Sequence, residues 1–171
     1  MTNPDPHPAR TSGAPTPEEL IAHYNLEPIP REGGLFRRTW AGPERPDGRP
    51  EGTAIVALLT ADDFSALHRL PFAEIWHFYL GDPLHLLLLA PDGSTRTAVL
   101  GPALRAGQHL QFTVPAGTWM GARVAQGGAW SLFGCTMAPG FTYPDYEHGD
   151  ADVLAARYPA EAARIRELCR P

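Results

Sequence analysis

Residues 64–81 read Phe-Ser-Ala-Leu-His-Arg-Leu-Pro-Phe-Ala-Glu-Ile-Trp-His-Phe-Tyr-Leu-Gly. The stretch contains two β-type runs, 64–70 and 74–80. In a strand, side chains alternate between two faces, so Glu74 shares its face with the apolar residues Trp76, Phe78 and Leu80. A carboxylate on an apolar face needs a partner or a shifted pKa. The stretch therefore predicts paired strands with a functional carboxylate facing the interior.

Seven further runs of the same kind extend outward from this stretch. They cover residues 35–40, 53–60, 84–90, 95–100, 110–114, 118–124 and 129–137. Glycine- and proline-containing turns separate them, and no helical period lies between them. Short strands at this spacing favour an antiparallel sandwich or barrel over parallel βαβ units. We predict one all-β domain over residues 16–171.

Both ends of that domain are predicted to be helical. Thr16, Pro17 and Glu19 form a capping-box start for a helix that stops before Pro28. Asp150 caps a second helix over 151–158, and a last short helix covers 160–168. Residues 1–15 are rich in proline and poor in apolar side chains, so we predict a disordered tail there.

Composition excludes several classes of protein. A chain of 171 residues with 43% apolar content can bury a core without a metal or disulfide staple. No apolar run reaches the roughly eighteen residues of a membrane span, and we expect no membrane partner. A net charge of −5 argues against a nucleic-acid partner. With no secretory signal, Cys135 and Cys169 are expected to be free thiols of a cytoplasmic protein.

A second informative stretch, residues 107–120, reads Gly-Gln-His-Leu-Gln-Phe-Thr-Val-Pro-Ala-Gly-Thr-Trp-Met. Together the two stretches resemble the paired motifs of the cupin superfamily. His68 matches the first histidine of motif one, and Glu74 and Gly81 follow at its spacing. Pro115 and Gly117 supply the core of motif two. The phrases at 76–84, 114–119 and 138–141 narrow the resemblance to the cupin-5 family, over about residues 20–158.

The resemblance implies a double-stranded β-helix, or jelly-roll barrel, that is usually dimeric and related to deoxysugar-nucleotide epimerases. Apolar residues on both faces of runs 74–80 and 84–90 also favour a homodimer, since only one face can line the barrel. We therefore expect a homodimer with a small-molecule ligand.

Metal-dependent cupins bind their ion with three histidines and one glutamate. Here Leu70 stands at the second histidine position and Met120 at the third. Leucine coordinates nothing, and a thioether is a soft ligand, so no cofactor is expected. One alternative stays open. A β-bulge that turned His77 inward would assemble His68, Glu74 and His77 as a set for a divalent metal.

Other candidates have a functional and a structural interpretation. Trp76, Phe78 and Trp119 would stack on a ligand ring, or they simply form core. His77 would contact the ligand or pack outward, and Gln111 would orient a ligand or join strands. Met120 widens an apolar pocket. Tyr143 lies in the segment 139–147, which is either a lid over the barrel mouth or a packing loop.

The leading prediction is a small-molecule-binding cupin. Its most concrete catalytic form is a metal-independent isomerase or epimerase for a sugar-like or keto substrate. By analogy with the related epimerases, His68 would remove a proton and Tyr143 or Tyr79 would return one. Glu74 or Asp145 would orient His68. The alternatives are a metal-dependent cupin oxygenase and a non-enzymatic sensor or carrier.

Overall fold

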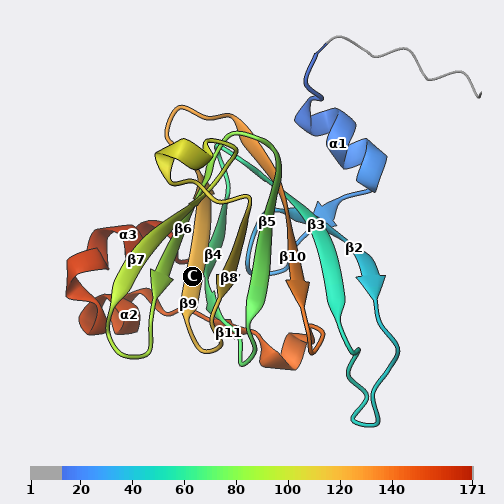
Figure 1. The fold of residues 1–171 in the computed structure, drawn as a ribbon. Coiled ribbons are helices and arrows are strands. Elements are labelled where there is room, and N and C mark those ends of the chain that lie inside the picture. Colours follow the sequence, from blue (N-terminus) through green and yellow to red (C-terminus); the bar gives the residue numbers. More distant parts are fainter. Residues whose placement is uncertain (1–12, 171) are drawn as a thin grey trace, which may run out of the picture.

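Two antiparallel β-sheets face each other and enclose the main apolar core (Figure 1). A computed structural model describes residues 13–170, so residues 1–12 of the predicted tail lie outside the described residues. The six-stranded sheet consists, in spatial order, of β1 (Glu27–Pro28), β2 (Leu35–Ala41), β3 (Thr53–Thr60), β10 (Trp130–Met137), β5 (Glu74–Gly81) and β8 (Gln111–Val114). The five-stranded sheet consists of β11 (Glu147–His148), β4 (Phe64–Arg69), β9 (Trp119–Val124), β6 (Leu84–Leu89) and β7 (Thr95–Leu100).

All nine predicted runs are strands, and the predicted all-β jelly roll is confirmed. The observed ends differ from the predicted ones by a single residue at most. Two strands were not predicted, namely β1 and β11. Each has only two residues, which is too short for an alternating pattern to show.

The described helices are α1 (Pro17–Tyr24), α2 (Ala151–Arg157) and α3 (Ala162–Glu167), with short 3-10 turns at Leu104–Ala106, Tyr143–Asp145 and Pro159–Glu161. The capping box is confirmed, because Glu19 N donates to Thr16 Oγ1 at 3.3 Å and Thr16 N donates to Glu19 Oε2 at 2.8 Å. Asp150 accepts from two backbone amides of α2, also as predicted. The predicted helix over 160–168 is instead a 3-10 turn followed by α3.

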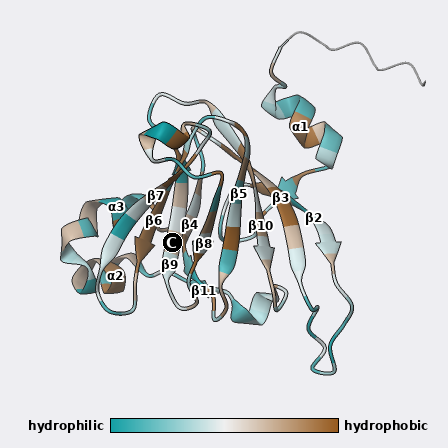
Figure 2. Cartoon of the chain, viewed as in Figure 1, coloured by the Kyte–Doolittle hydropathy of each residue, from teal (hydrophilic) through white to brown (hydrophobic). Residues whose placement is uncertain are grey.

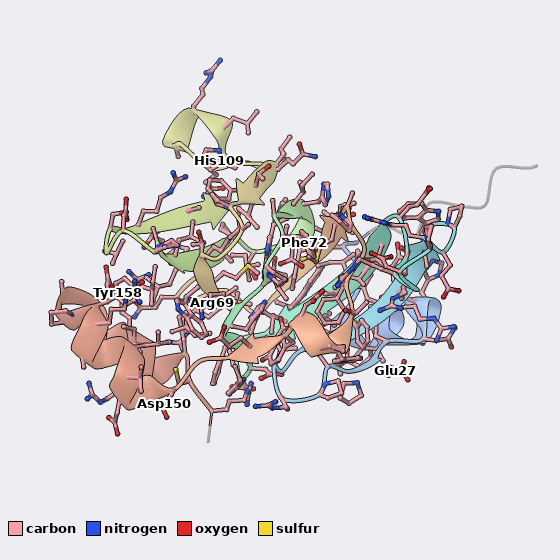
Figure 3. All side chains as sticks on the ribbon, turned by 90° about the horizontal axis from the view of Figure 1, so that it is seen from below. Glu27, Arg69, Phe72, His109, Asp150 and Tyr158 are labelled. Carbon is pink, nitrogen blue, oxygen red and sulfur yellow. The ribbon has the colours of Figure 1, made fainter. Side chains whose placement is uncertain are left out.

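Figure 1 shows α2 and α3 beside the five-stranded sheet, whereas α1 lies at the upper right, near the β2 and β3 side of the other sheet. Leu20 of α1 packs in one cluster with Leu58 and Leu132 on the six-stranded sheet. On the other side, α2 and α3 pack on the five-stranded sheet, and Asp150 and Tyr158 mark that side in Figure 3, away from Glu27. Figure 2 shows hydrophobic residues along β3, β5 and β6, and hydrophilic ones in the β2–β3 connection. No helix within residues 13–170 is long and apolar enough to cross a membrane.

Candidate ligand site in the barrel cavity

An internal cavity of about 60 Å³ lies between the two sheets. Most of its lining is apolar, with contributions from β2, β3, β4, β5 and β10. Its polar and charged side chains are Glu32, Arg38, Thr53, His68, Glu74, Cys135, Tyr143 and Tyr146. A cavity of this size holds several water-sized groups, so it suits a compact ligand or the reacting end of a larger one.

A β-bulge in β4 positions His68. Ser65 pairs with Ala122 and His68 pairs with Met120, so β4 has one extra residue between these pairs. The His68 side chain is buried, and its Nδ1 lies 2.8 Å from the Ala66 carbonyl oxygen. Because a carbonyl oxygen only accepts, Nδ1 carries the ring proton. Nε2 is therefore left as the nitrogen that can accept a proton from a bound molecule.

Glu74 lies on β5 and is buried at the cavity wall. The indole Nε1 of Trp76 donates to Glu74 Oε2 at 2.8 Å. Burial raises the pKa of the Glu74 carboxyl to about 7, and the nearby Glu32 acts in the same direction against the opposing effect of His68. Glu74 can thus hold or release a proton near neutral pH, as an acid–base group must.

Glu32 is a second cavity carboxylate, which the sequence did not reveal. Ser65 Oγ donates to Glu32 Oε1 at 2.6 Å. The chain turns directly after it, through Gly33 (φ 95°) and Gly34 (φ 77°). A Cβ on Gly33 would lie 2.5 Å from the Phe64 carbonyl oxygen, so only glycine allows this close approach. The Gly-Gly pair is the one sequence signal that marks this turn.

Tyr146 is another cavity residue that sequence reasoning did not select. Its ring stacks on the His68 ring, with centroids 5.3 Å apart and planes 19° apart. Burial raises the pKa of the Tyr146 phenol, and the Glu32 charge adds to this, so the hydroxyl stays protonated. The strand β11 fixes this placement, because its His148 pairs with His68.

Cys135 of β10 also lines the cavity and is buried. Burial raises the pKa of its thiol well above the ordinary value. Both Cys135 and Cys169 are free thiols, as the sequence predicted. A protonated thiol is a poor nucleophile, so Cys135 contributes a weak hydrogen-bond donor to the site.

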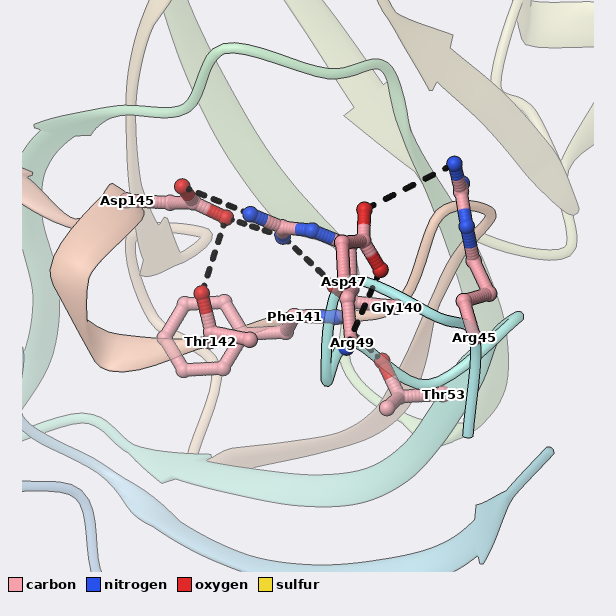
Figure 4. Close-up of polar contacts among 8 residues, drawn as sticks. All are labelled: Arg45, Asp47, Arg49, Thr53, Gly140, Phe141, Thr142 and Asp145. Atoms are coloured by element: carbon pink, nitrogen blue, oxygen red, sulfur yellow. Dashed lines mark hydrogen bonds and ion pairs between the residues drawn. The ribbon is translucent and has the colours of Figure 1, made fainter. Parts of the chain in front are cut away.

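Hydrogen bonds and an ion pair join the segment that follows β10 to the connection between β2 and β3 (Figure 4). Arg49 binds Asp145 through both guanidinium Nη atoms, and its Nη1 also donates to the Gly140 carbonyl oxygen at 3.0 Å. Phe141 N donates to Thr53 Oγ1 at 2.9 Å. Because Phe141 and Tyr143 line the cavity, these contacts hold one wall of the cavity closed.

Replacing Arg49 by alanine is therefore expected to loosen residues 140–145. The variant loses a charge-assisted pair, so backbone amide exchange over this segment should rise on the order of tenfold. Hydrogen–deuterium exchange measured by mass spectrometry checks this. Arg45→Ala is the matched control, because Arg45 lies in the same connection and its guanidinium pairs with exposed Asp47 at 3.7 Å. Equal exchange in both variants would contradict the role given to Arg49.

His77 and Gln111 lie outside the cavity. The β-bulge in β5 falls at Tyr79, after His77, and His77 therefore stays on the outer face opposite Gly134. Its Nε2 lies 2.9 Å from Thr136 Oγ1, and its Nδ1 lies 3.2 Å from Gln111 Nε2. In the described structure, His77 therefore does not turn into the barrel, as it would have to in order to bind a metal together with His68 and Glu74.

The three aromatic candidates do not all lie on the inner face of the sheets. Trp76 lines the cavity and stacks on Phe133 at 5.0 Å. Phe78 packs against the same core without lining the cavity. Trp119 lies on the outer face of the five-stranded sheet, beneath the Arg69 guanidinium at 4.7 Å. The structure therefore brings only Trp76 of these three to the site.

Two candidates remain to be placed. Met120 is buried in the interior core beside His68, behind the cavity lining. Tyr143 lies on the cavity wall, with its side chain 54% exposed. The position of Tyr143 at the mouth suits contact with a ligand, whereas Tyr146 is the tyrosine next to His68.

The donor set does not suit the divalent metal of metal-dependent cupins. Leu70 and Met120 are both buried beside His68 and offer no hard ligand. Within the described residues, no three His, Cys, Asp or Glu side chains are grouped so that they could hold an ion.

Comparison with known proteins agrees with this fold. Residues 18–149 match the Cupin_5 family model, described as "Cupin superfamily (DUF985)". The crystal structure of protein SO0799 from Shewanella oneidensis shares 34% identity and a TM-score of 0.86, over 92% of this chain and 99% of that one. A hypothetical protein from Leishmania major shares 31% identity and a TM-score of 0.83, over 92% and 100%.

A cupin 2 domain-containing protein from Halorhodospira halophila is more distant. It has 16% identity and a TM-score of 0.55, over 80% of this chain and 84% of that one, so it supports the fold alone. No protein of curated function matches the chain. The family model and the two close structures confirm the resemblance carried by the motifs at His68 and Pro115. The chain therefore belongs to the Cupin_5 family of the cupin superfamily.

Proposed function

We propose that the barrel cavity binds a compact organic ligand and moves a proton on it without a metal. The observation that carries the proposal is that His68 and Glu74 line the same mostly apolar cavity. A small-molecule site of this kind combines apolar walls with a few polar groups that fix orientation. Glu74, whose pKa burial raises to about 7, supplies a group that changes protonation at working pH.

The reaction class is isomerisation or epimerisation next to a carbonyl. His68 Nε2 removes the proton from the carbon beside the keto group, and the electron pair moves toward the carbonyl oxygen. Glu74 in its protonated form donates a hydrogen bond to that oxygen, which stabilises the enolate. A proton then returns to carbon from His68 or from a second group.

The cavity also sets a limit on the ligand. A volume of about 60 Å³ accommodates a small keto compound or one end of a sugar-like molecule. A bulky remainder would have to extend past Tyr143 at the mouth. This size favours short 2-keto acids and hydroxyketones over whole sugar nucleotides.

A ligand panel tests the binding part of the proposal. Thermal shift with short 2-keto acids, hydroxyketones and sugar nucleotides should identify a compact keto compound that stabilises the wild-type protein. His68→Asn should lose that shift, whereas His109→Asn, at an exposed histidine, should keep it. No stabilising compound in the panel, or equal shifts in both variants, would count against this site.

A non-enzymatic sensor or carrier is the second candidate, and the apolar lining favours it. Such a protein would bind the ligand through the same walls but would leave its C–H bonds intact. Proton exchange from the bound ligand to solvent therefore separates the two functions.

We also propose that the protein is a cytoplasmic homodimer. Tyr79 and Leu80 of β5 and the neighbouring Leu110 are large apolar side chains, each between 45% and 50% exposed. Burial of such residues against a second copy would remove apolar area from water. Light scattering at micromolar concentration should give twice the 18.6 kDa chain mass, and a monomeric mass would contradict the dimer.

A further inference from the structure

Tyr146 and His148 form a hydrogen-bonded pair that the reaction above does not use. Tyr146 Oη lies 2.8 Å from His148 Nδ1, and His148 Nε2 lies 3.3 Å from the Arg170 carbonyl oxygen. Because the carbonyl oxygen only accepts, Nε2 carries a proton in this contact. His148 Nδ1 is then the acceptor, and the Tyr146 hydroxyl donates to it.

The pair passes through the wall of the barrel. Tyr146 lines the internal cavity, where its ring stacks on His68. His148 lines an open hollow on the surface, together with Arg31, Asp150 and Arg170. This placement follows from β11, which is the edge strand of its sheet and lies beside β4. One end of the pair therefore faces the ligand space and the other faces water.

We propose that Tyr146 and His148 are a proton relay between a ligand in the cavity and water in the surface hollow. The proposal rests on the proposed function, because it names the second proton-transfer group of the same cavity. His68 then serves one side of the carbon centre, and the relay supplies the other.

The relay balances without an oxidant or reductant. As the ligand C–H bond breaks, its electron pair stays on the ligand as an enolate and its proton forms an O–H bond at Tyr146 Oη. The original hydroxyl proton of Tyr146 moves to His148 Nδ1. The resulting imidazolium releases its Nε2 proton to water in the surface hollow, which breaks the hydrogen bond from Nε2 to the Arg170 carbonyl oxygen. The reverse sequence delivers a solvent proton to the enolate.

Two features of the structure suit Tyr146 to this role. Burial raises the pKa of its phenol, so the oxygen returns to the protonated state after each transfer. The guanidinium of Arg31 lies 5.8 Å from the Tyr146 ring centroid. That positive charge lowers the cost of negative charge on the phenol oxygen during transfer.

The experiment uses water alone as the probe, in the full-length protein. Proton NMR follows exchange of the Tyr146 hydroxyl, which is assigned by its loss in Tyr146→Phe. His148→Gln keeps a side-chain oxygen that accepts the hydroxyl bond but cannot take up the proton. We expect hydroxyl exchange to slow at least tenfold in His148→Gln and to stay unchanged in the exposed control His109→Gln. Equal or faster exchange in His148→Gln, the result for a purely structural pair, would overturn the relay.

A second measurement keeps the test decisive if His148→Gln does not fold. Wild-type protein labelled with 15N-histidine should show His148 with its proton on Nε2 and Nδ1 as an acceptor, and the opposite tautomer would overturn the relay. These readouts need no substrate. Failure of the relay is therefore separate from failure of the proposed function, which is measured by solvent exchange of ligand C–H bonds.

Discussion

Replacing Glu74 by glutamine is expected to remove a pH dependence of stability. In the folded protein burial raises the pKa of Glu74 from 4.5 to about 7. Between these values the folded state binds more protons than the unfolded state, so wild-type stability falls as the pH rises through this window. The neutral glutamine amide of the variant has no such loss, and its carbonyl oxygen can still accept from Trp76 Nε1.

The size of this effect follows from the pKa difference. From pH 5 to pH 8, the unfolding free energy of Glu74→Gln should rise relative to that of wild type by about 2–3 kcal/mol. Urea unfolding at several pH values, followed by tryptophan fluorescence, measures the difference. Glu44→Gln, at an exposed carboxylate, should track the wild type throughout. Parallel curves for Glu74→Gln and wild type would show that Glu74 is not held protonated by burial.

Replacing His68 by asparagine is expected to abolish the reaction while leaving the fold in place. A general base typically contributes a factor of about 10² to 10⁴ in rate, so turnover of a bound keto compound should fall at least 100-fold. Asparagine retains an amide N–H near the Ala66 carbonyl, which limits the structural cost. Far-ultraviolet circular dichroism checks the fold, and proton NMR in D₂O follows the ligand.

His68→Gln is the second variant, in case the shorter side chain disturbs the β4 bulge. Both variants lack the imidazole Nε2, so both should lose exchange of the ligand C–H hydrogen on the side of the carbon that His68 serves. Retention of wild-type exchange in a folded His68 variant would remove His68 from the mechanism.

Most of the fold could be predicted from sequence because local signals and tertiary structure agree. Alternating apolar residues marked the longer strands, and glycine and proline marked their ends. The capping residues Thr16 and Asp150 marked helix starts. The strands β1 and β11 escaped prediction because two residues carry no pattern, and pairing with a longer neighbour alone makes them strands.

The candidate site was predictable only where strand alternation or motif spacing marks its residues. Alternation placed Glu74 and Trp76 inside, and the motif spacing selected His68. Bulges change this alternation, and their positions depend on pairing with neighbouring strands. The bulge in β5 lies at Tyr79, beyond His77, so the regular alternation from Glu74 keeps His77 outside. Trp119 of β9 faces outward onto the helices.

Glu32 and Tyr146 lie in connecting segments, where no period exists to indicate direction. Glu32 reaches the cavity through the turn at Gly33, and Tyr146 through the short strand β11. Both placements depend on contacts between residues distant in sequence, such as the bond from Ser65 Oγ to Glu32. Sequence spacing alone carries no information on such contacts.

The central claim is that His68 and Glu74 move a proton on a ligand without a metal. Its most direct test is deuterium exchange, in D₂O, at the carbon next to the carbonyl of a short 2-keto acid or hydroxyketone that stabilises the protein. We predict that chelator-treated wild-type protein exchanges the hydrogen on the side of the carbon that His68 serves at the rate of untreated protein, and that His68→Asn does not. Exchange that disappears on chelation and returns with a divalent metal would contradict the account.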